Sequence, residues 1–274
     1  MTQAVFDFHG RTAVVTGGSG ALGGAIARGL AAAGARVALV ANRRLQEAEA
    51  AASDIRKAGG AALACRADVL SKPSLEALAE KVVAEFGPVD ILVNAAGGAA
   101  KNATTSPTLS FFELPEDAVR GVFDLNWLGT FLPCQVFGRV LQGRGQGAIL
   151  NISSWGALHP LTRSVAYSAA KAAVSNFTQW LAVHLAQTYG PGIRVNALAP
   201  GFIVTEQNRF LLLDAATGEL TERGRRIVAQ TPFGRLGRPE DVVGPALWLL
   251  SDAAAFVHGS VVLVDGGMSA WGGV

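Results

Sequence analysis

Three side chains with complementary chemistry lie close together in one stretch of the chain: Ser154, Tyr167 and Lys171. If Tyr167 opens a helix, Lys171 stands one turn later on the same face. An ammonium beside a phenol stabilises the phenolate and lowers a pKa that is ordinarily about 10, giving a proton donor or acceptor that works near neutral pH. Tyrosine and lysine at this spacing are also common on ordinary helices, so the surrounding elements must decide between the two interpretations.

Those elements favour the chemical interpretation. Residues 147–154 form an apolar run typical of a buried strand, so the Ser154 hydroxyl could meet the phenol oxygen over a substrate. Near the N-terminus, an apolar strand over 11–16 precedes the glycine-rich run 17–24, an alanine-rich helix over 25–33 and a second strand. Strand, glycine turn, helix and strand in this order place a dinucleotide pyrophosphate at a helix N-terminus.

Apolar strands and helical stretches alternate along the whole chain. This pattern predicts an α/β fold, with a single Rossmann-type doubly wound domain over residues 1–274 and a parallel sheet of about seven strands flanked by helices. Ligands of such sheets bind at the carboxyl ends of the strands. Two long excursions, 97–115 and about 202–232, are too large to be simple connections and are candidate walls of a substrate site.

Composition excludes several other classes of protein. Half of the 274 residues are hydrophobic, 16% are charged and the net charge is +2, which gives no reason to expect a nucleic acid or a membrane as partner. The two cysteines, Cys65 and Cys134, are expected to be small buried hydrophobes, and no metal site is expected. Residues 1–10 lack a basic region followed by an apolar run, and no apolar stretch is long enough to span a bilayer. We therefore expect a cytoplasmic protein.

Together these features resemble the short-chain dehydrogenase/reductase family over nearly the whole chain. The family's glycine motif falls on Thr16, Gly17 and Gly23, with Ala21 in place of its middle glycine; a methyl group should be tolerated there if φ stays negative. The resemblance implies a catalytic tetrad of Asn126, Ser154, Tyr167 and Lys171. It also implies that the dinucleotide contacts Gly17, Ser19, Ala21, Leu22, Gly23, Asn42, Arg43, Asp68, Val69, Asn94, Ala95, Gly97, Tyr167, Lys171, Pro200, Gly201, Ile203 and Thr205.

The resemblance also implies a role for each member of the tetrad. Tyr167 exchanges the proton of the substrate oxygen, and Ser154 hydrogen-bonds and positions that oxygen. Lys171 lowers the phenol pKa and holds the nicotinamide ribose, and Asn126 supports a water that connects Lys171 to solvent. The choice of cofactor rests on the end of the second strand, where the family's NAD-selective acid is replaced by Ala41, followed by Asn42-Arg43-Arg44. Either arginine could pair with a 2′-phosphate or be solvated, and we favour NADP(H) modestly over NAD(H).

Several stretches resemble a sugar-acid branch of the family, the D-mannonate oxidoreductases or fructuronate reductases. An aldonate or uronate needs a cation and several polar groups, which Lys101, Ser154, His159, Arg163 and Arg209 could supply, with Arg163 best placed for the carboxylate. Reduction of another ketose, a ketogluconate or a 3-oxoacyl thioester stays open, as does a non-catalytic dinucleotide-binding protein. By resemblance we also expect a homotetramer, with Phe177, Trp180, Leu181 and His184 at helical spacing on a candidate interface.

Overall fold

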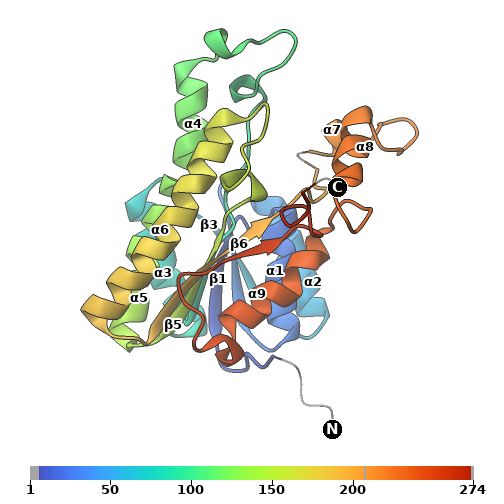
Figure 1. Ribbon diagram of the computed structural model, residues 1–274. Helices are drawn as coiled ribbons and strands as arrows, with labels where there is room; N and C mark the ends of the chain where they lie inside the picture. The colour runs from blue at the N-terminus through green and yellow to red at the C-terminus, as the bar shows by residue number, and fades with distance from the viewer. Residues whose placement is uncertain (1–5, 207, 273–274) are drawn as a thin grey trace.

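One parallel sheet organises the chain (Figure 1). The computed structural model describes residues 6–272 except residue 207. All adjacent strands are parallel, in the order β3-β2-β1-β4-β5-β6-β7, as predicted for a doubly wound fold. The strands are β1 (Thr12–Thr16), β2 (Arg36–Ala41), β3 (Ala61–Arg66), β4 (Ile91–Asn94), β5 (Gly147–Ile152), β6 (Ile193–Pro200) and β7 (Val261–Val264).

Helices cover both faces of this sheet, with α1, α2 and α9 on one side and α3, α5 and α6 on the other (Figure 1). Neighbouring strand residues point to opposite faces, so Val15 joins the core beneath α1 while Val14 joins the core beneath α3. The helices are α1 (Ala21–Ala32), α2 (Leu45–Lys57), α3 (Lys72–Phe86), α4 (Glu116–Asn126), α5 (Leu128–Arg144), α6 (Val165–Tyr189), α7 (Arg209–Leu212), α8 (Glu222–Ala229) and α9 (Val243–Leu250). Burial on both faces explains why β1, with five buried residues, reads as a continuous apolar run.

The glycine run forms a tight turn between β1 and α1. Gly17 has φ +66°, and a Cβ on it would lie 2.6 Å from the Ala95 carbonyl oxygen, so only glycine fits there. Helix α1 begins at Ala21, four residues earlier than the pattern predicted, because the second half of the glycine run is already helical. Among the described residues no residue other than glycine has positive φ, so Ala21 keeps the negative φ that its methyl group requires.

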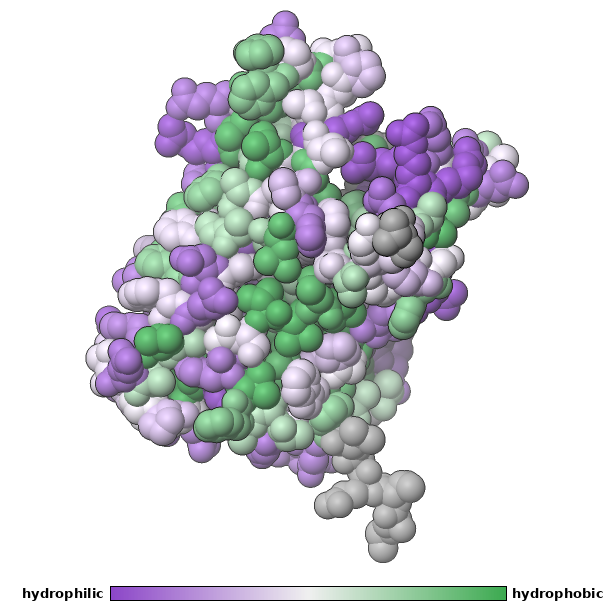
Figure 2. All heavy atoms as spheres, viewed as in Figure 1, coloured by the Kyte–Doolittle hydropathy of each residue, from purple (hydrophilic) through white to green (hydrophobic). Residues whose placement is uncertain are grey.

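Two excursions rise above the carboxyl ends of the strands. The first, after β4, carries the short 3-10 turns η1 (Lys101–Ala103) and η2 (Phe111–Glu113) before α4. The second, after β6, carries α7 and α8, over which hydrophilic residues gather at the surface (Figures 1 and 2). The region predicted as a loop from 202 to 232 therefore contains two helices, and α9 follows in a stretch where the sequence pattern predicted no element.

Candidate active site

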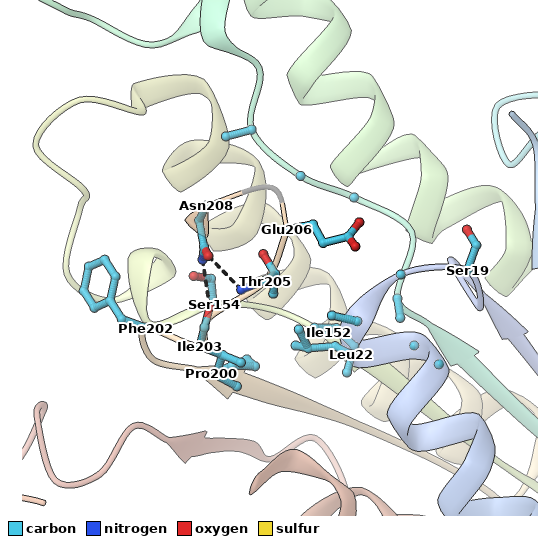
Figure 3. A pocket seen from close by; sticks show the side chains of 18 of the residues that line it. Ser19, Leu22, Ile152, Ser154, Pro200, Phe202, Ile203, Thr205, Glu206 and Asn208 are labelled. Atoms are coloured by element: carbon cyan, nitrogen blue, oxygen red, sulfur yellow. Dashed lines mark hydrogen bonds between the residues drawn. The ribbon is translucent and has the colours of Figure 1, made fainter. Parts of the chain in front are cut away.

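A cavity of about 690 Å³ runs along the carboxyl ends of the central strands. It reaches from the glycine turn to the residues just before α6, and Figure 3 shows its walls. Ser19 lies at one end and Ser154, Phe202 and Asn208 at the other, with Leu22 and Ile152 between them. The glycine turn and the group around Tyr167 therefore face one continuous cavity. Gly20 and Tyr167 are 147 residues apart in the sequence.

Ser154, Tyr167 and Lys171 all line this cavity. Tyr167 and Lys171 lie in the first turns of α6, and Ser154 follows β5. The Ser154 hydroxyl accepts a hydrogen bond of 3.0 Å from the Gly156 amide, which fixes its rotamer. Lys171 is 4% exposed, and its Nζ donates to the Ile152 carbonyl oxygen at 2.7 Å and lies 5.7 Å from the centre of the Tyr167 ring. Burial and hydrogen bonds hold these three side chains in place.

Burial shifts the pKa values of both Tyr167 and Lys171. It raises the pKa of the Tyr167 phenol above its usual value, and a hydrogen bond with Ser154 offsets only part of that rise. The pKa of the phenol therefore lies above its usual value, and not below it as the proximity of Lys171 predicts, because desolvation is the largest cause of the shift. Burial also lowers the pKa of Lys171 to about 8. Near neutral pH the phenol is protonated and the lysine is mostly an ammonium, so the site is set to donate a proton.

Asn126 lies behind the cavity wall and does not line it. It ends α4 and is fully buried, with its Nδ2 donating to the Gly98 and Val122 carbonyl oxygens, each at 2.8 Å, and its Oδ1 accepting from the Gly98 amide at 3.1 Å. A Cβ on Gly97 would lie 2.5 Å from Asn126 Oδ1 and 3.2 Å from Lys171 Nζ. Asn126 and Lys171 thus approach each other across Gly97, and Asn126 holds the loop after β4.

The glycine-turn end has the features that a dinucleotide pyrophosphate requires. No side chain caps α1, and its first turn holds no acidic residue. Its first backbone N–H groups have no partner within the helix and face an anion-binding position. Of the expected contacts in this part of the chain, Ser19, Ala21, Leu22, Gly23, Ala95 and Gly97 line the cavity. These residues fit a dinucleotide.

Arg44 is the arginine after β2 that lines the cavity, whereas Asn42 and Arg43 are exposed and do not line it. One Arg44 nitrogen donates to the Ser19 carbonyl oxygen at 2.9 Å, so the side chain reaches back over the glycine turn. Glu47 accepts a hydrogen bond from the same guanidinium at 3.2 Å, and the Glu206 carboxylate lies 4.0 Å away across the cavity. The sequence indicated Asn42 and Arg43 as dinucleotide contacts and Arg44 only as an alternative partner for a 2′-phosphate, but the fold brings Arg44 to the cavity.

Four other expected cofactor contacts do not line the cavity. Gly17 forms the turn itself, and Asp68 and Val69 follow β3 outside the cavity lining. Asn94 is buried, and its Nδ2 donates to Asn151 Oδ1 at 2.9 Å, which connects the ends of β4 and β5. Direct contact with a dinucleotide stays a prediction for each of these residues.

The loop after β6 supplies the floor beside the catalytic group. Pro200, Gly201, Ile203 and Thr205 all line the cavity, as expected. Asn208 pins this loop, because its Oδ1 accepts from the Thr205 amide at 2.8 Å and its Nδ2 donates to the Ile203 carbonyl oxygen at 2.7 Å (Figure 3). The same amide side chain thus fixes both ends of the segment that would face a nicotinamide.

Of the expected substrate residues, Ser154 lines the cavity and the four basic ones do not. Lys101 opens η1 and is exposed; His159 stacks on Trp155 with ring centres 4.8 Å apart. Arg163 is exposed, with its carbonyl oxygen accepting from the Thr105 amide, and Arg209 begins α7. Gln207, a further polar candidate, lies outside the described residues. The lining also includes residues that the sequence did not indicate, among them Trp155, Phe202 and Arg223.

The chain has clear relatives. Residues 18–269 match the family model described as enoyl-(acyl carrier protein) reductase. The chain belongs to the short-chain dehydrogenase/reductase family. It is 46% identical to the uncharacterized oxidoreductase UxuB of Bacillus subtilis over 98% of both chains.

Two solved structures extend this comparison. One, a candidate D-mannonate oxidoreductase of Haemophilus influenzae with bound NAD, is 40% identical over 98% of both chains, with a TM-score of 0.90. The other, a candidate NAD(P)-dependent gluconate 5-dehydrogenase of Beutenbergia cavernae with bound NADP at low occupancy, is 38% identical. The match covers 98% of this chain and 100% of that one, with a TM-score of 0.85. The protein is thus an NAD(P)-dependent oxidoreductase that acts on alcohols or ketones.

Within the described residues, no helix is long and apolar enough to cross a membrane. The same part of the chain holds no group of three or more histidine, cysteine, aspartate or glutamate side chains that could bind a metal ion.

Proposed function

We propose that the protein interconverts D-fructuronate and D-mannonate at a secondary alcohol. The observation that carries the redox chemistry is the group Ser154, Tyr167 and Lys171 at one end of a cavity whose other end is the glycine turn. The choice of substrate draws on the similarity to the Haemophilus influenzae protein, whose name gives D-mannonate. A polyhydroxylated acid also suits a cavity whose lining includes Ser164, Thr205 and Asn208.

In the direction of reduction, the proposed roles follow from protonation and position. Ser154 donates a hydrogen bond to the substrate carbonyl oxygen and orients it toward the phenol. Tyr167, kept protonated by burial, transfers its proton to that oxygen as the alcohol forms. A nicotinamide dinucleotide, when bound, supplies the hydride that the carbonyl carbon receives. Lys171 holds the nicotinamide ribose, and Asn126 positions the loop and the lysine behind it. In oxidation each transfer is reversed.

We propose NADP(H) as the preferred cofactor. Ala41, buried at the end of β2, offers no carboxylate to repel a 2′-phosphate, and Arg44 reaches into the cavity beside Ser19. Glu47 competes for the same guanidinium, so the preference should be modest.

We further propose a cytoplasmic homotetramer. On α6, Phe177 and Leu181 are each 8% exposed and belong to the core, whereas Trp180 is 55% exposed and stacks on His184. On β7, Leu263 is 39% exposed at the edge of the sheet, where Figure 2 shows apolar residues gathered at the centre of this face. Both surfaces are suited to contact further copies of the chain.

A panel of carbonyl substrates tests this function. Initial rates are measured with NADPH and NADH on D-fructuronate, a ketogluconate, a neutral ketose, a ketosteroid and a 3-oxoacyl thioester. We expect the highest kcat/KM for D-fructuronate with NADPH. A higher kcat/KM for any other substrate would replace the proposed one. Tight dinucleotide binding without turnover of any substrate would favour a non-catalytic binding protein.

A further inference from the structure

We propose that Arg223 binds the carboxylate of the substrate and so makes the enzyme selective for sugar acids over neutral sugars. This proposal rests on the proposed function, because it requires an anionic substrate. It assigns the charge-reading role to a residue of the α7–α8 excursion that no motif of the family indicated.

Arg223 lines the same cavity as Ser154 and Tyr167. It lies in the first turn of α8, and this turn is fixed in three ways. Thr221 Oγ1 accepts from the Gly224 amide at 3.0 Å and donates to the Leu211 carbonyl oxygen at 2.7 Å. Gly224 packs so tightly that a Cβ on it would lie 2.3 Å from the Leu212 carbonyl oxygen. The backbone that presents Arg223 to the cavity is therefore held in advance, which reduces the entropic cost of binding.

The charge of Arg223 is not compensated within the described part of the chain. Arg223 is half-buried, and among the described residues no ion pair or side-chain hydrogen bond engages its guanidinium. Burial lowers its pKa, and the nearby Arg163 guanidinium lowers it further. Two neighbouring positive charges without a carboxylate between them attract an anion, because its negative charge compensates the cost of burying the guanidinium and reduces the repulsion between the two arginines.

The other cations on the cavity wall have different positions or partners. Lys171 donates to the Ile152 carbonyl oxygen, and Arg44 contacts Ser19 and Glu47 at the glycine-turn end. Arg28 lies on α1, next to that same end. The acidic residues of the lining are Glu47, Asp54 and Glu206, of which Glu47 and Glu206 are oriented toward Arg44. Among the described basic residues that line the cavity, Arg223 is thus the one at the substrate end without an ion-pair or side-chain hydrogen-bond partner.

The proximity of Arg163 shows that Arg223 lies at the substrate end of the cavity. Arg163 stands four residues before Tyr167, and the cavity-lining residues Leu161 and Ser164 flank it in the sequence. A ligand whose carbonyl oxygen contacts Ser154 and Tyr167 could therefore extend a carboxylate to Arg223. Arg163, exposed and outside the lining, would support this anion through its charge without contacting it.

The test compares Arg223→Ala, Arg223→Lys and the control Arg226→Ala on a matched pair of substrates. Arg226 lies on the same helix, pairs with Glu222 and is 76% exposed, so its removal changes the same charge away from the cavity. The substrates are D-fructuronate and D-fructose, which carries –CH2OH in place of the carboxylate.

For Arg223→Ala we expect kcat/KM on the acid to fall about ten- to hundredfold, mainly through KM, and on the neutral sugar less than about threefold. Arg223→Lys should recover part of the loss, added guanidinium should partly rescue Arg223→Ala, and Arg226→Ala should match the wild type.

A second measurement separates the substrate from the cofactor. The Kd of NADPH, followed by fluorescence, should change less than twofold in Arg223→Ala. Binding of D-mannonate to the enzyme–NADPH complex, which cannot react, should weaken as much as kcat/KM falls. A weakened Kd for NADPH with equal losses on both sugars would assign Arg223 to a cofactor phosphate and overturn the proposal. Efficient wild-type turnover of sugar acids with no selective loss in Arg223→Ala would overturn the role of Arg223 alone. Turnover of neutral substrates only would overturn both the role and the proposed function.

Discussion

Lys171 Nζ donates a 2.7 Å hydrogen bond to the carbonyl oxygen of Ile152, the last residue of β5. This bond ties the ammonium to the strand that carries Ser154 into the site. It also places a positive charge in a position that is 4% exposed, which lowers the pKa of Lys171 to about 8. The catalytic geometry is therefore obtained at a cost in stability that depends on pH.

That cost leads to a prediction for Lys171→Met. The folded-state pKa of about 8 lies below the ordinary value of 10.5. The free-energy cost of burying the ammonium is therefore fully present below pH 8 and is lost as the pH rises to 10.5. Between these values the free energy of unfolding of the wild type should rise relative to that of Lys171→Met, by up to about 3 kcal/mol at 1.36 kcal/mol per pKa unit. Urea unfolding of both proteins at several pH values measures the difference. A difference independent of pH would show that Lys171 is not buried as a cation.

Tyr167→Phe should abolish proton transfer while leaving the cavity intact. We expect turnover to fall about 10²–10⁴-fold, the usual contribution of a general acid or base, with the Kd of NADPH nearly unchanged. Tyr189→Phe is the matched control, because Tyr189 is the other tyrosine of the chain, 53% exposed at the end of α6. Single-turnover hydride transfer decides the question. A loss smaller than about tenfold would assign the proton to another group.

Arg44→Ser should reduce the preference for NADP(H). Arg44 lines the cavity and Arg43 does not, so Arg43→Ser is the control with the same loss of charge. A charge-assisted hydrogen bond contributes about 1.5–3 kcal/mol, and partial exposure and competition from Glu47 reduce it, so we expect kcat/KM for NADPH to fall about fivefold relative to NADH. Steady-state kinetics with both cofactors measure this ratio. Equal effects of the two variants would remove Arg44 as the phosphate-reading residue.

Sedimentation velocity at micromolar concentration should give a mass of about four chains of 28.3 kDa. Trp180→Glu places a charge on the exposed part of α6 and should shift the protein to a smaller species. Val83→Glu introduces the same charge at a residue of α3 that is 40% exposed, and should leave the mass unchanged. A monomeric wild type would refute the tetramer.

Local sequence patterns were enough to predict the sheet, the glycine turn and the grouping of Ser154, Tyr167 and Lys171. These features depend on local patterns: a buried parallel strand reads as an apolar run, and Gly17 is required by a positive φ within its own turn. The parallel arrangement then brings all strand ends to one edge, so residues far apart in the chain were predicted to meet there. The start of α1 was less well predicted, because glycine suppresses the helical signal of residues 21–24.

The choice of cations that reach the cavity and the protonation of Tyr167 depend on tertiary packing, which local patterns do not reveal. Arg43 was expected to contact the dinucleotide, but the direction of the chain as it enters α2 brings Arg44 into the lining instead. Arg223 faces Tyr167's cavity because Thr221 and Gly224 fix α8 against α7, a packing that no local pattern specifies. The rise in the pKa of Tyr167 depends on desolvation by the whole surrounding structure, whereas the sequence reveals only the nearby charge of Lys171.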